Sequence, residues 1–323
     1  TDDDYIISAD ILHNRKQNSA TVVDYNLAYG PITFDGRPTY QSVTHADGVD
    51  NVSNEYVLTN SKNDGSSTII SFTLSKSFDF GLDAALGYSY TNAEDANPMT
   101  SAVAGSNYGN LATADALNPP VTTSDYEIPH RFTLNLSYGV ELIAGLETRF
   151  SLFGQASEGQ AYSYTFDDSD GAFGDDNWNG DRQLLYIPTV GDANVVYGAE
   201  FDKDAFDAFI ASEGLARGQT TGRNAQNADW HVSFDIKINQ EVPGLIEGHR
   251  GNAFFIIKNV GNLLNDDWGV MKQGEFVGNR MVEMSIQSDG KYVYESFNEG
   301  NEDQNYYKDA SLWEMRVGIS YDF

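Results

Sequence analysis

The last eleven residues of the chain, WEMRVGISYDF (313–323), decide its fold. Side chains of a β-strand point to opposite faces in turn, so every second residue lies on the same face. One face of this stretch is polar, and the other carries Trp313, Met315, Val317, Ile319, Tyr321 and Phe323. Aromatic residues at both ends of an apolar row are typical of a strand with lipid on one side and water on the other. An edge strand of a soluble sandwich is the alternative that this stretch alone leaves open.

The same alternation recurs at 80–91, 132–138 and 230–239. In the last of these runs, Asp235 and Lys237 lie opposite a continuous apolar row, so the second face must contact water. The longer runs reach ten residues or more, whereas strands of globular proteins have about five or six. A tilted membrane-crossing strand needs about 9–11 residues. The pattern therefore favours membrane-crossing strands over a soluble sandwich.

Composition excludes several classes of function. The chain has 19 Lys and Arg against 48 Asp and Glu, a net charge of −29, whereas nucleic-acid binding needs a basic surface. It has no cysteine, which excludes disulfides and cysteine-based zinc sites. No run approaches the length of an apolar membrane helix. The five histidines have no metal-ligand spacing, and we expect neither a cofactor nor an enzymatic activity.

Long alternating runs predict eight strands, at 4–12, 54–77, 80–92, 126–138, 145–158, 228–241, 252–262 and 311–323. We expect the second to be kinked near Asn63, Asp64 and Gly65, which form turns readily. Long connections (13–53, 93–125, 159–227 and 263–310) alternate with short ones (78–79, 139–144 and 242–251). Outer-membrane barrels have long extracellular loops and short periplasmic turns. The predicted fold class is therefore all-β, an antiparallel transmembrane β-barrel.

The loop at 159–227 contains one predicted helix. Asp202 or Asp204 can cap its start, and Gly214 can end it. Phe206, Phe209 and Ile210 form an apolar stripe at helical spacing. We interpret this helix as packing the loop against its neighbours.

Four segments are similar to one family. They are YEIPHRFTLNLSYG (126–139), DNWNGDRQLLYIP (176–188), GRNAQNADWHVSFDIKINQEVPG (222–244) and FFIIKNVGNLLNDDWG (254–269). The first resembles the Pro-His-Arg-Phe strand of TonB-dependent outer-membrane receptors, in particular their Oar-like branch. The other three resemble an acidic loop segment, the penultimate inward strand with its turn, and the Asn-Leu-Leu-Asn strand of that branch.

The resemblance implies a barrel of 22 strands with an N-terminal plug domain in its lumen, of which residues 1–323 form about the last eight strands. The plug and the segment that contacts TonB are absent from this sequence, so we expect it to be part of a longer chain. The implied location is the outer membrane of a Gram-negative bacterium. The implied partners are outer-membrane lipid, the barrel-assembly machinery, and TonB through the missing N-terminal part. The terminal residues Val317, Ile319, Tyr321 and Phe323 resemble the signature of barrel assembly.

An acidic stretch of the same loop is a candidate metal site. Asp175, Asn177, Asn179 and Asp181 surround Gly180 at a spacing close to that of a calcium loop. Tyr186 stands where an EF-hand needs a bidentate Glu, so the segment is not an EF-hand. A looser calcium site and a plain Asn/Asp/Gly turn are the two interpretations that remain.

The expected function is uptake of a scarce extracellular ligand by a receptor of this type. Aromatic residues offer large, rigid contact areas, and the loop candidates for ligand contact are Tyr162, Tyr164, Trp178, Tyr186, Tyr197, Trp268 and Phe276. Packing within the loops is the alternative role for each of them. A surface binding or adhesion protein anchored by the barrel is the second hypothesis. An outer-membrane enzyme is the third, and its only candidate parts are His45 and His130.

Overall fold

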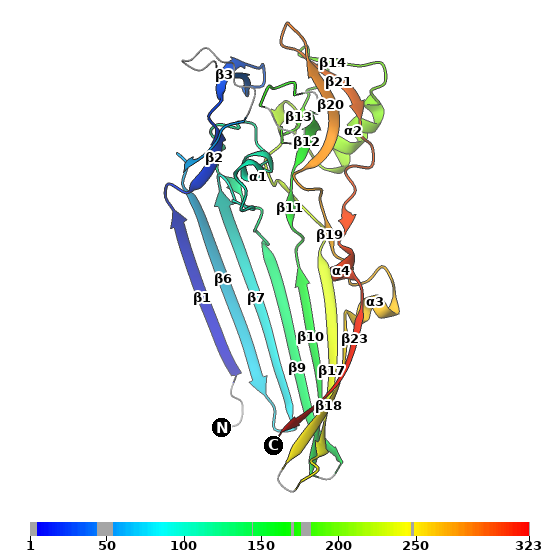
Figure 1. Ribbon diagram of the computed structural model, residues 1–323. Coiled ribbons are helices and arrows are strands. Elements are labelled where there is room, and N and C mark those ends of the chain that lie inside the picture. The colour runs from blue at the N-terminus through cyan, green and yellow to red at the C-terminus, as the bar shows by residue number, and fades with distance from the viewer. Residues whose placement is uncertain are drawn as a thin grey trace.

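Eight long strands form one antiparallel sheet in chain order, as seen in the computed structural model (Figure 1). The structure describes residues 5–43, 54–143, 145–168, 171–175, 182–246 and 249–322. The long strands are β1 (Tyr5–Lys16), β6 (Gly65–Ser77), β7 (Leu82–Asp95), β9 (His130–Ile143), β10 (Leu146–Ser157), β17 (His231–Pro243), β18 (Arg250–Lys258) and β23 (Glu314–Asp322). The predicted all-β class is confirmed, and each of the eight predicted strands has its counterpart in this sheet.

The register gives the sheet one apolar and one polar face. Residues directly opposite each other on paired strands lie on the same face. Leu74 stands between Ile7 on β1 and Leu86 on β7, and Leu86 in turn faces Leu134 on β9. At the other end of the sheet, apolar residues of β17 face those of β18, which face those of β23. The alternate positions on the polar face are mostly Ser, Thr, Asn, Gln and charged residues, and Phe153, Phe254 and Ile256 are among the exceptions.

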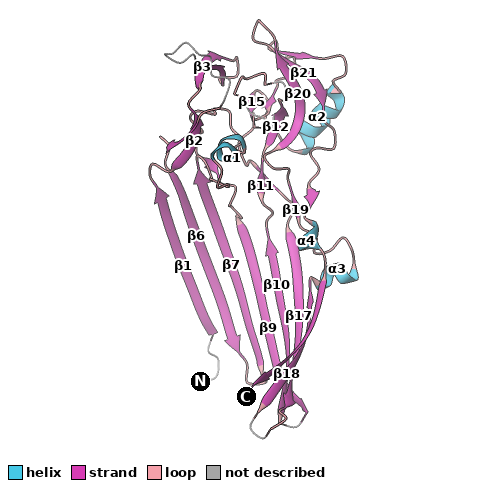
Figure 2. Ribbon diagram, in the orientation of Figure 1, coloured by secondary structure: helices cyan, strands magenta, loops and turns pink. Residues whose placement is uncertain are grey.

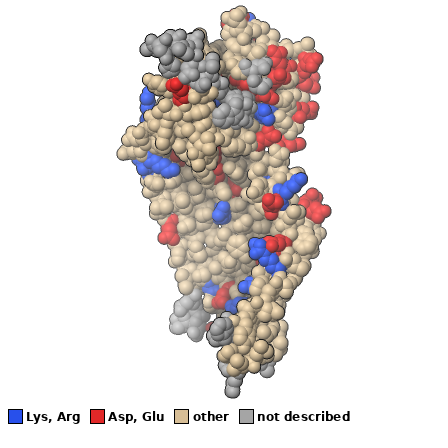
Figure 3. All heavy atoms as spheres, in the orientation of Figure 1, with Lys and Arg blue, Asp and Glu red and all other residues tan. Residues whose placement is uncertain are grey.

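The apolar face is largely uncovered. Phe72 is 49% exposed and Leu86 is 51% exposed in the middle of their strands. On β23, Val317 and Ile319 are 75% and 80% exposed. The middle of the molecular surface in Figure 3 carries few charges, whereas Asp and Glu gather around β20, β21 and α2. A row of large apolar side chains in contact with solvent is costly in water, at about 25 cal/mol per Å².

The connections separate by length, as predicted. The long connections lie at one end of the sheet, and the short turns lie at the end where the two chain termini are found (Figure 1). In the part of the chain that the structure describes, β1 and β23 occupy the two edges and do not pair with each other. No helix in that part is long and apolar enough to cross a membrane.

Several predicted strands have other bounds than predicted. β1 continues to Lys16 rather than ending at residue 12, and β9 covers His130–Ile143 rather than 126–138. The run 54–77 is broken at the predicted kink, because β5 (Tyr56–Asn60) leaves the long sheet and pairs with β2 (Ala20–Asp24). Gly65 begins β6 where its backbone passes close to Glu94, and an added Cβ would lie 2.6 Å from the Glu94 carbonyl oxygen. The predicted strand 252–262 ends at Lys258, because Asn259 adopts a left-handed φ of 49° and starts α3 (Val260–Leu264).

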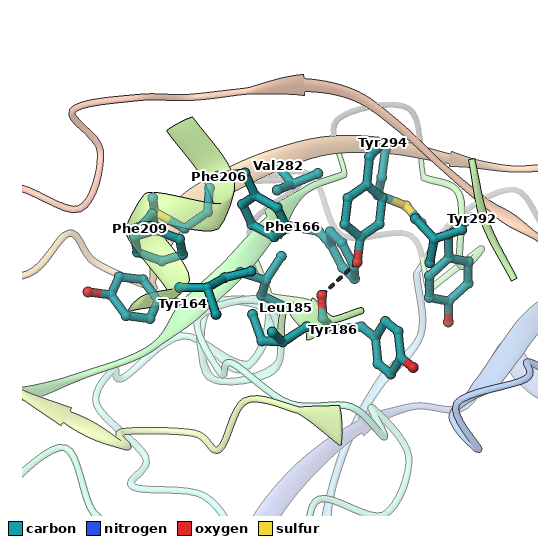
Figure 4. Packing of buried hydrophobic residues seen from close by; sticks show 14 of the residues in the cluster. Tyr164, Phe166, Leu185, Tyr186, Phe206, Phe209, Val282, Tyr292 and Tyr294 are labelled. Carbon is teal, nitrogen blue, oxygen red and sulfur yellow. Dashed lines mark hydrogen bonds between the residues drawn. The ribbon is translucent and has the colours of Figure 1, made fainter. Parts of the chain in front are cut away.

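The loops contain more structure than the single predicted helix. A mixed sheet of β12 (Tyr164–Asp167), β20 (Asn279–Ile286), β21 (Tyr292–Phe297) and β14 (Val195–Tyr197) connects the third and fourth long loops (Figure 2). We call this sheet, α2 and the segments packed on them the loop domain. Its buried core is aromatic (Figure 4), and the hydroxyl of Tyr294 donates to the Tyr186 carbonyl over 2.6 Å.

The predicted helix is α2 (Lys203–Ser212). The carboxylate of Asp202 accepts a hydrogen bond from the Ala205 amide at its N-terminus, which satisfies one of the free donors there. Phe206, Phe209 and Ile210 are buried in the loop-domain core. The interpretation that this helix packs the loop is confirmed.

A second, smaller core lies above β6 and β7. It contains Val22, Leu27, Tyr40, Tyr108 and Ala116. These residues come from β2, the hairpin of β3 (Leu27–Ile32) and β4 (Pro38–Ser42), and the segment around α1 (Ala104–Gly109). The first two long loops therefore also fold into a defined structure.

Replacing Phe206 by Ala should loosen the loop domain and leave the long sheet intact. Phe206 is fully buried against Phe201, Phe209, Tyr294 and Phe297, and a buried Phe to Ala change costs about 3–5 kcal/mol. Hydrogen exchange should accelerate in β12, β20 and β21, with Leu245→Ala, at a 94% exposed position, as the control. Unchanged exchange in the loop domain would contradict this account of its core.

Candidate functional site

The polar face of the sheet is hollowed below the loops. A cavity of about 770 Å³ is lined by polar-face residues at the loop ends of β9, β10 and β17, among them Arg131, Gln155 and Asp235. Segments around α3 and α4 (Lys308–Ser311) close another side, with Trp313 in the wall. We call this space the upper cavity. It has water-facing polar groups on the sheet and mixed groups on the loops, as a solute-binding space needs.

A smaller cleft of about 130 Å³ adjoins the upper cavity between the loops. Asp125 and Gln160 line both spaces, so a solute in the cleft would contact side chains that also face the cavity. Tyr162 and Phe276 supply aromatic surface to the cleft. The sequence prediction chose these two aromatics separately, and the structure brings them to one place.

Asp125 is held in position by its neighbours. Its carboxylate accepts a hydrogen bond from the Asn224 side-chain amide over 2.5 Å, and its carbonyl accepts one from Gln160. Burial raises the pKa of the Asp125 carboxyl, and the Asn224 hydrogen bond and the charge of Arg223 lower it only in part. Sequence reasoning did not single out Asp125, because the pairing depends on a residue about one hundred positions away in the chain.

Arg223 and Asn224 connect the third long loop to the loop end of the sheet by hydrogen bonds. The Arg223 guanidinium donates to the Asp95 carboxylate over 2.8 Å and to the carbonyls of Asp95, Thr122 and Thr123. This charge is buried, so its many acceptors offset its lost hydration. Asn224 adopts a left-handed φ of 54°, and its side-chain Nδ2 donates to the Thr123 carbonyl.

A buried ion pair joins three of the long loops. The Arg37 guanidinium lies 2.7 Å from the Asp35 carboxylate, and both side chains are almost fully buried. Arg37 also donates to the Leu184 carbonyl and the Thr220 hydroxyl. The Tyr292 hydroxyl donates to Asp35 over 2.8 Å. Burial acts to raise the pKa of the Asp35 carboxyl, but Arg37 and the hydrogen bonds outweigh it and hold that pKa below its usual value.

The predicted ligand aromatics divide into two groups. Tyr162, Tyr164 and Tyr186 lie in the loop-domain core, and Tyr197 packs against that core from its edge. Trp268 and Phe276 are 56% and 66% exposed and remain available to a ligand. Trp178 lies outside the described residues. Ligand contact stays a prediction for all of them. The structure gives the buried tyrosines a packing role, and Tyr162 also lines the cleft.

Only one of the predicted calcium ligands lies within the described residues. The Asp175 carboxylate accepts a hydrogen bond from Gln183 over 2.8 Å and faces the Arg182 guanidinium. Asn177, Asn179 and Asp181 lie outside the described residues, so the calcium site stays a prediction. Among the residues that the structure does describe, no group of three His, Asp or Glu could hold a metal ion.

The terminal signature residues lie on the apolar face of β23. Val317 and Ile319 are strongly exposed, and Tyr321 is 39% exposed. The Tyr321 hydroxyl accepts a hydrogen bond from the Leu245 amide and contacts His249 in the short turn beside it. Phe323 lies outside the described residues. Of the two histidines considered for an enzyme, His45 also lies outside them, and His130 stacks on Trp230.

We expect Arg37→Met to destabilise the loop domain by about 3–5 kcal/mol, because it leaves the buried Asp35 carboxylate without its charge partner. Arg217→Met is the matched control, since the Arg217–Asp207 pair is partly exposed and such pairs contribute about 0–1 kcal/mol. Limited proteolysis of the loops measures both effects. Equal cleavage rates for the two variants would contradict the role given to the Asp35–Arg37 pair.

Stability of the loop domain should depend on Asp168 below neutral pH. Burial raises the pKa of the Asp168 carboxyl from 3.8 to about 7, although the amides of Ala172 and Phe173 donate to it. Because the folded-state pKa lies above the unfolded one, this group lowers stability progressively as pH rises from about 4 to about 7. Asp168→Asn keeps an acceptor oxygen and should flatten that dependence, as hydrogen exchange at several pH values would show. The same dependence of exchange on pH in the wild type and in Asp168→Asn would contradict the role given to Asp168.

Comparison with protein-family models, curated proteins and solved structures returns no match for this chain. The function is therefore inferred from the two-faced sheet and from the spaces between its polar face and the loops.

Proposed function

We propose that this chain is part of the barrel of a TonB-dependent outer-membrane receptor that takes up a scarce extracellular solute. The observation that carries the proposal is the two-faced sheet. Its apolar face is long, continuous and exposed, whereas the opposite face is polar and hollowed. Lipid outside and water inside is the environment that such a sheet fits best.

Aromatic residues support a membrane position for the sheet. Tyr321 lies near the turn end of β23, and Trp313 directly precedes the strand, eight residues away. This separation corresponds to about 26 Å along a strand, and to about 20 Å across a bilayer at the tilt of about 40° that barrel strands have. An outer-membrane barrel has an apolar band about 25 Å tall between two aromatic girdles. Near the loop ends of the strands, the His130 ring stacks between Tyr88 and Trp230, so aromatic contacts continue along this level of the sheet.

The open edges determine what else the receptor needs. Unpaired backbone groups of β1 and β23 would find no water in a bilayer, at a cost of several kcal/mol each. The proposal therefore includes further strands that close the barrel, 22 in all as the family resemblance implies. The plug and TonB-contacting segments are part of the same proposed receptor, as is recognition of the terminal strand by the barrel-assembly machinery.

The arrangement of cavity and cleft favours uptake over anchoring. A barrel that only anchors a surface protein needs an apolar face toward lipid, but it needs no solute path along its polar face. Here the cleft between the loops adjoins a cavity on the polar face through Asp125 and Gln160. The alternative of a surface binding protein draws support from the loop domain, whose aromatic core gives it a defined structure.

A charge on the apolar face should impair membrane insertion, whereas one on the polar face should not. Leu86 lies on the exposed apolar face and Ala85 lines a polar-face cavity on the same strand. Leu86→Arg should cost about 2–4 kcal/mol of insertion free energy, and Ala85→Arg should cost little. Folding into phospholipid vesicles, read by heat-modifiable electrophoretic mobility, measures both. Equal insertion of the two variants would overturn the membrane assignment.

Transport itself is tested by what the cells remove from their medium. Every solute that a strain without the gene leaves in spent medium, as measured by mass spectrometry, should also be left by a strain without TonB. The surface-binding alternative predicts that deleting the gene changes cell attachment and leaves solute consumption as in the wild type. That second result would refute uptake and would leave membrane insertion untouched.

A further inference from the structure

Arg131 differs from most other arginines of this acidic chain. All ten arginines lie within the described residues, and eight of them pair with a carboxylate: Arg15, Arg37, Arg149, Arg182, Arg217, Arg223, Arg250 and Arg316. Within those residues, Arg131 forms no ion pair. Acidic residues outnumber basic ones by 48 to 19, so the chain has more than enough carboxylates to pair with every arginine. An unpaired guanidinium here is available to another anion.

The position of Arg131 places its charge on the water-facing side of the sheet. It is the second residue of β9, and its neighbours His130 and Phe132 belong to the opposite, apolar face. Arg131 stands directly across from Ser89 on β7 and Ser157 on β10. Side chains opposite each other on paired strands are close neighbours, so the guanidinium is flanked by hydroxyl groups.

Two hollows meet at this residue. Arg131 lines the upper cavity together with Gln155, Ser157 and Ser233. On its other side it lines a cavity of about 170 Å³ whose wall includes Ser71, Thr73 and Thr133. The other two basic side chains that line the upper cavity, Lys258 and Lys272, pair with Glu314 and Asp229. Among the described residues, Arg131 is therefore the one Lys or Arg in these two walls without a carboxylate partner, and hydroxyl and amide groups flank it.

The carboxylates of the upper cavity are mostly engaged elsewhere. Asp235 accepts a hydrogen bond from the Asn259 amide over 2.8 Å, and Asp125 accepts one from Asn224. Glu314 pairs with Arg316. Glu158 and Asp309 also line the cavity, but neither forms an ion pair with Arg131 in the described part of the chain. The guanidinium thus keeps its planar fork of donors free, the geometry that binds a carboxylate or phosphate through two hydrogen bonds.

We propose that Arg131 binds the oxyanion group of the transported solute, a hydroxyl-bearing molecule with a single carboxylate or phosphate. The surrounding Ser, Thr and Gln side chains bind its hydroxyls. The acidic loops above repel a polyanion, which restricts the class to solutes with one such group. This inference rests on the proposed uptake function, because it assigns the solute class of the same polar face.

The test uses calorimetric titration of the receptor in detergent with gluconate, glucose 6-phosphate and neutral glucose. Intrinsic tryptophan fluorescence is the second readout, and Trp313, which lines the same cavity, contributes to it. The wild type should bind gluconate or glucose 6-phosphate more tightly than glucose, and the preferred anion identifies the oxyanion. Arg131→Gln should weaken that binding at least tenfold, and Arg131→Lys should keep part of it, because a lysine retains the charge without the bidentate fork.

Arg149→Gln is the matched control. Arg149 also lies on the polar face, but it contacts Glu147 and Asp83, so its loss should leave anion binding unchanged. Equal binding by wild type and Arg131→Gln, or no preference for the anions over glucose at millimolar concentrations, would overturn the inference. Insertion of Arg131→Gln into vesicles is measured in parallel. Normal insertion of the wild type without anion binding refutes only this inference, whereas failure of the wild type to insert refutes the proposed function.

Discussion

The strict registration of two-faced strands is the constraint on which the rest of the structure depends. A slip of one residue would move every apolar side chain of a strand to the opposite face. The pairing keeps most apolar residues opposite apolar ones from β1 to β23 and most polar residues on the other face, and Ile256 opposite Lys237 is an exception. The upper cavity can hold polar groups only because this division holds along each strand. Both the exposed apolar face and the candidate solute path therefore derive from the same alternation.

The loops depend on a different set of forces. Their core is aromatic, but buried polar contacts determine how loops far apart in sequence meet. The Asp35–Arg37 pair connects the first long loop to Thr220 and Tyr292. Arg223 connects the third loop to the end of β7. A buried charge without its partner is costly, so these contacts favour one arrangement of the loops and hold the cleft in place above the cavity.

The sequence was sufficient to predict the sheet, because alternation with period two is visible within each strand. It was sufficient for α2 as well, since Asp202, Phe206 and Gly214 lie within one local pattern. The sheet of the loop domain was not predicted, because its strand pairings, such as Tyr164 with Asn279, join positions far apart in the chain. Asp125 and Arg131 were not predicted as site residues for the same reason. Asp125 depends on a hydrogen-bond partner that is distant in the chain, and the lack of an ion pair at Arg131 becomes visible only in the fold.

The most direct test of the central claim is the environment of each side chain along β17. The chain contains no cysteine, so single cysteines at 232–239 can carry spin labels without background. In vesicles, accessibility to oxygen should peak at Val232, Phe234, Ile236 and Ile238, and accessibility to a water-soluble nickel complex should peak at the residues between them. This period of two is expected when lipid and water lie on opposite faces of a strand. Uniform access of the nickel complex to both faces would contradict the account.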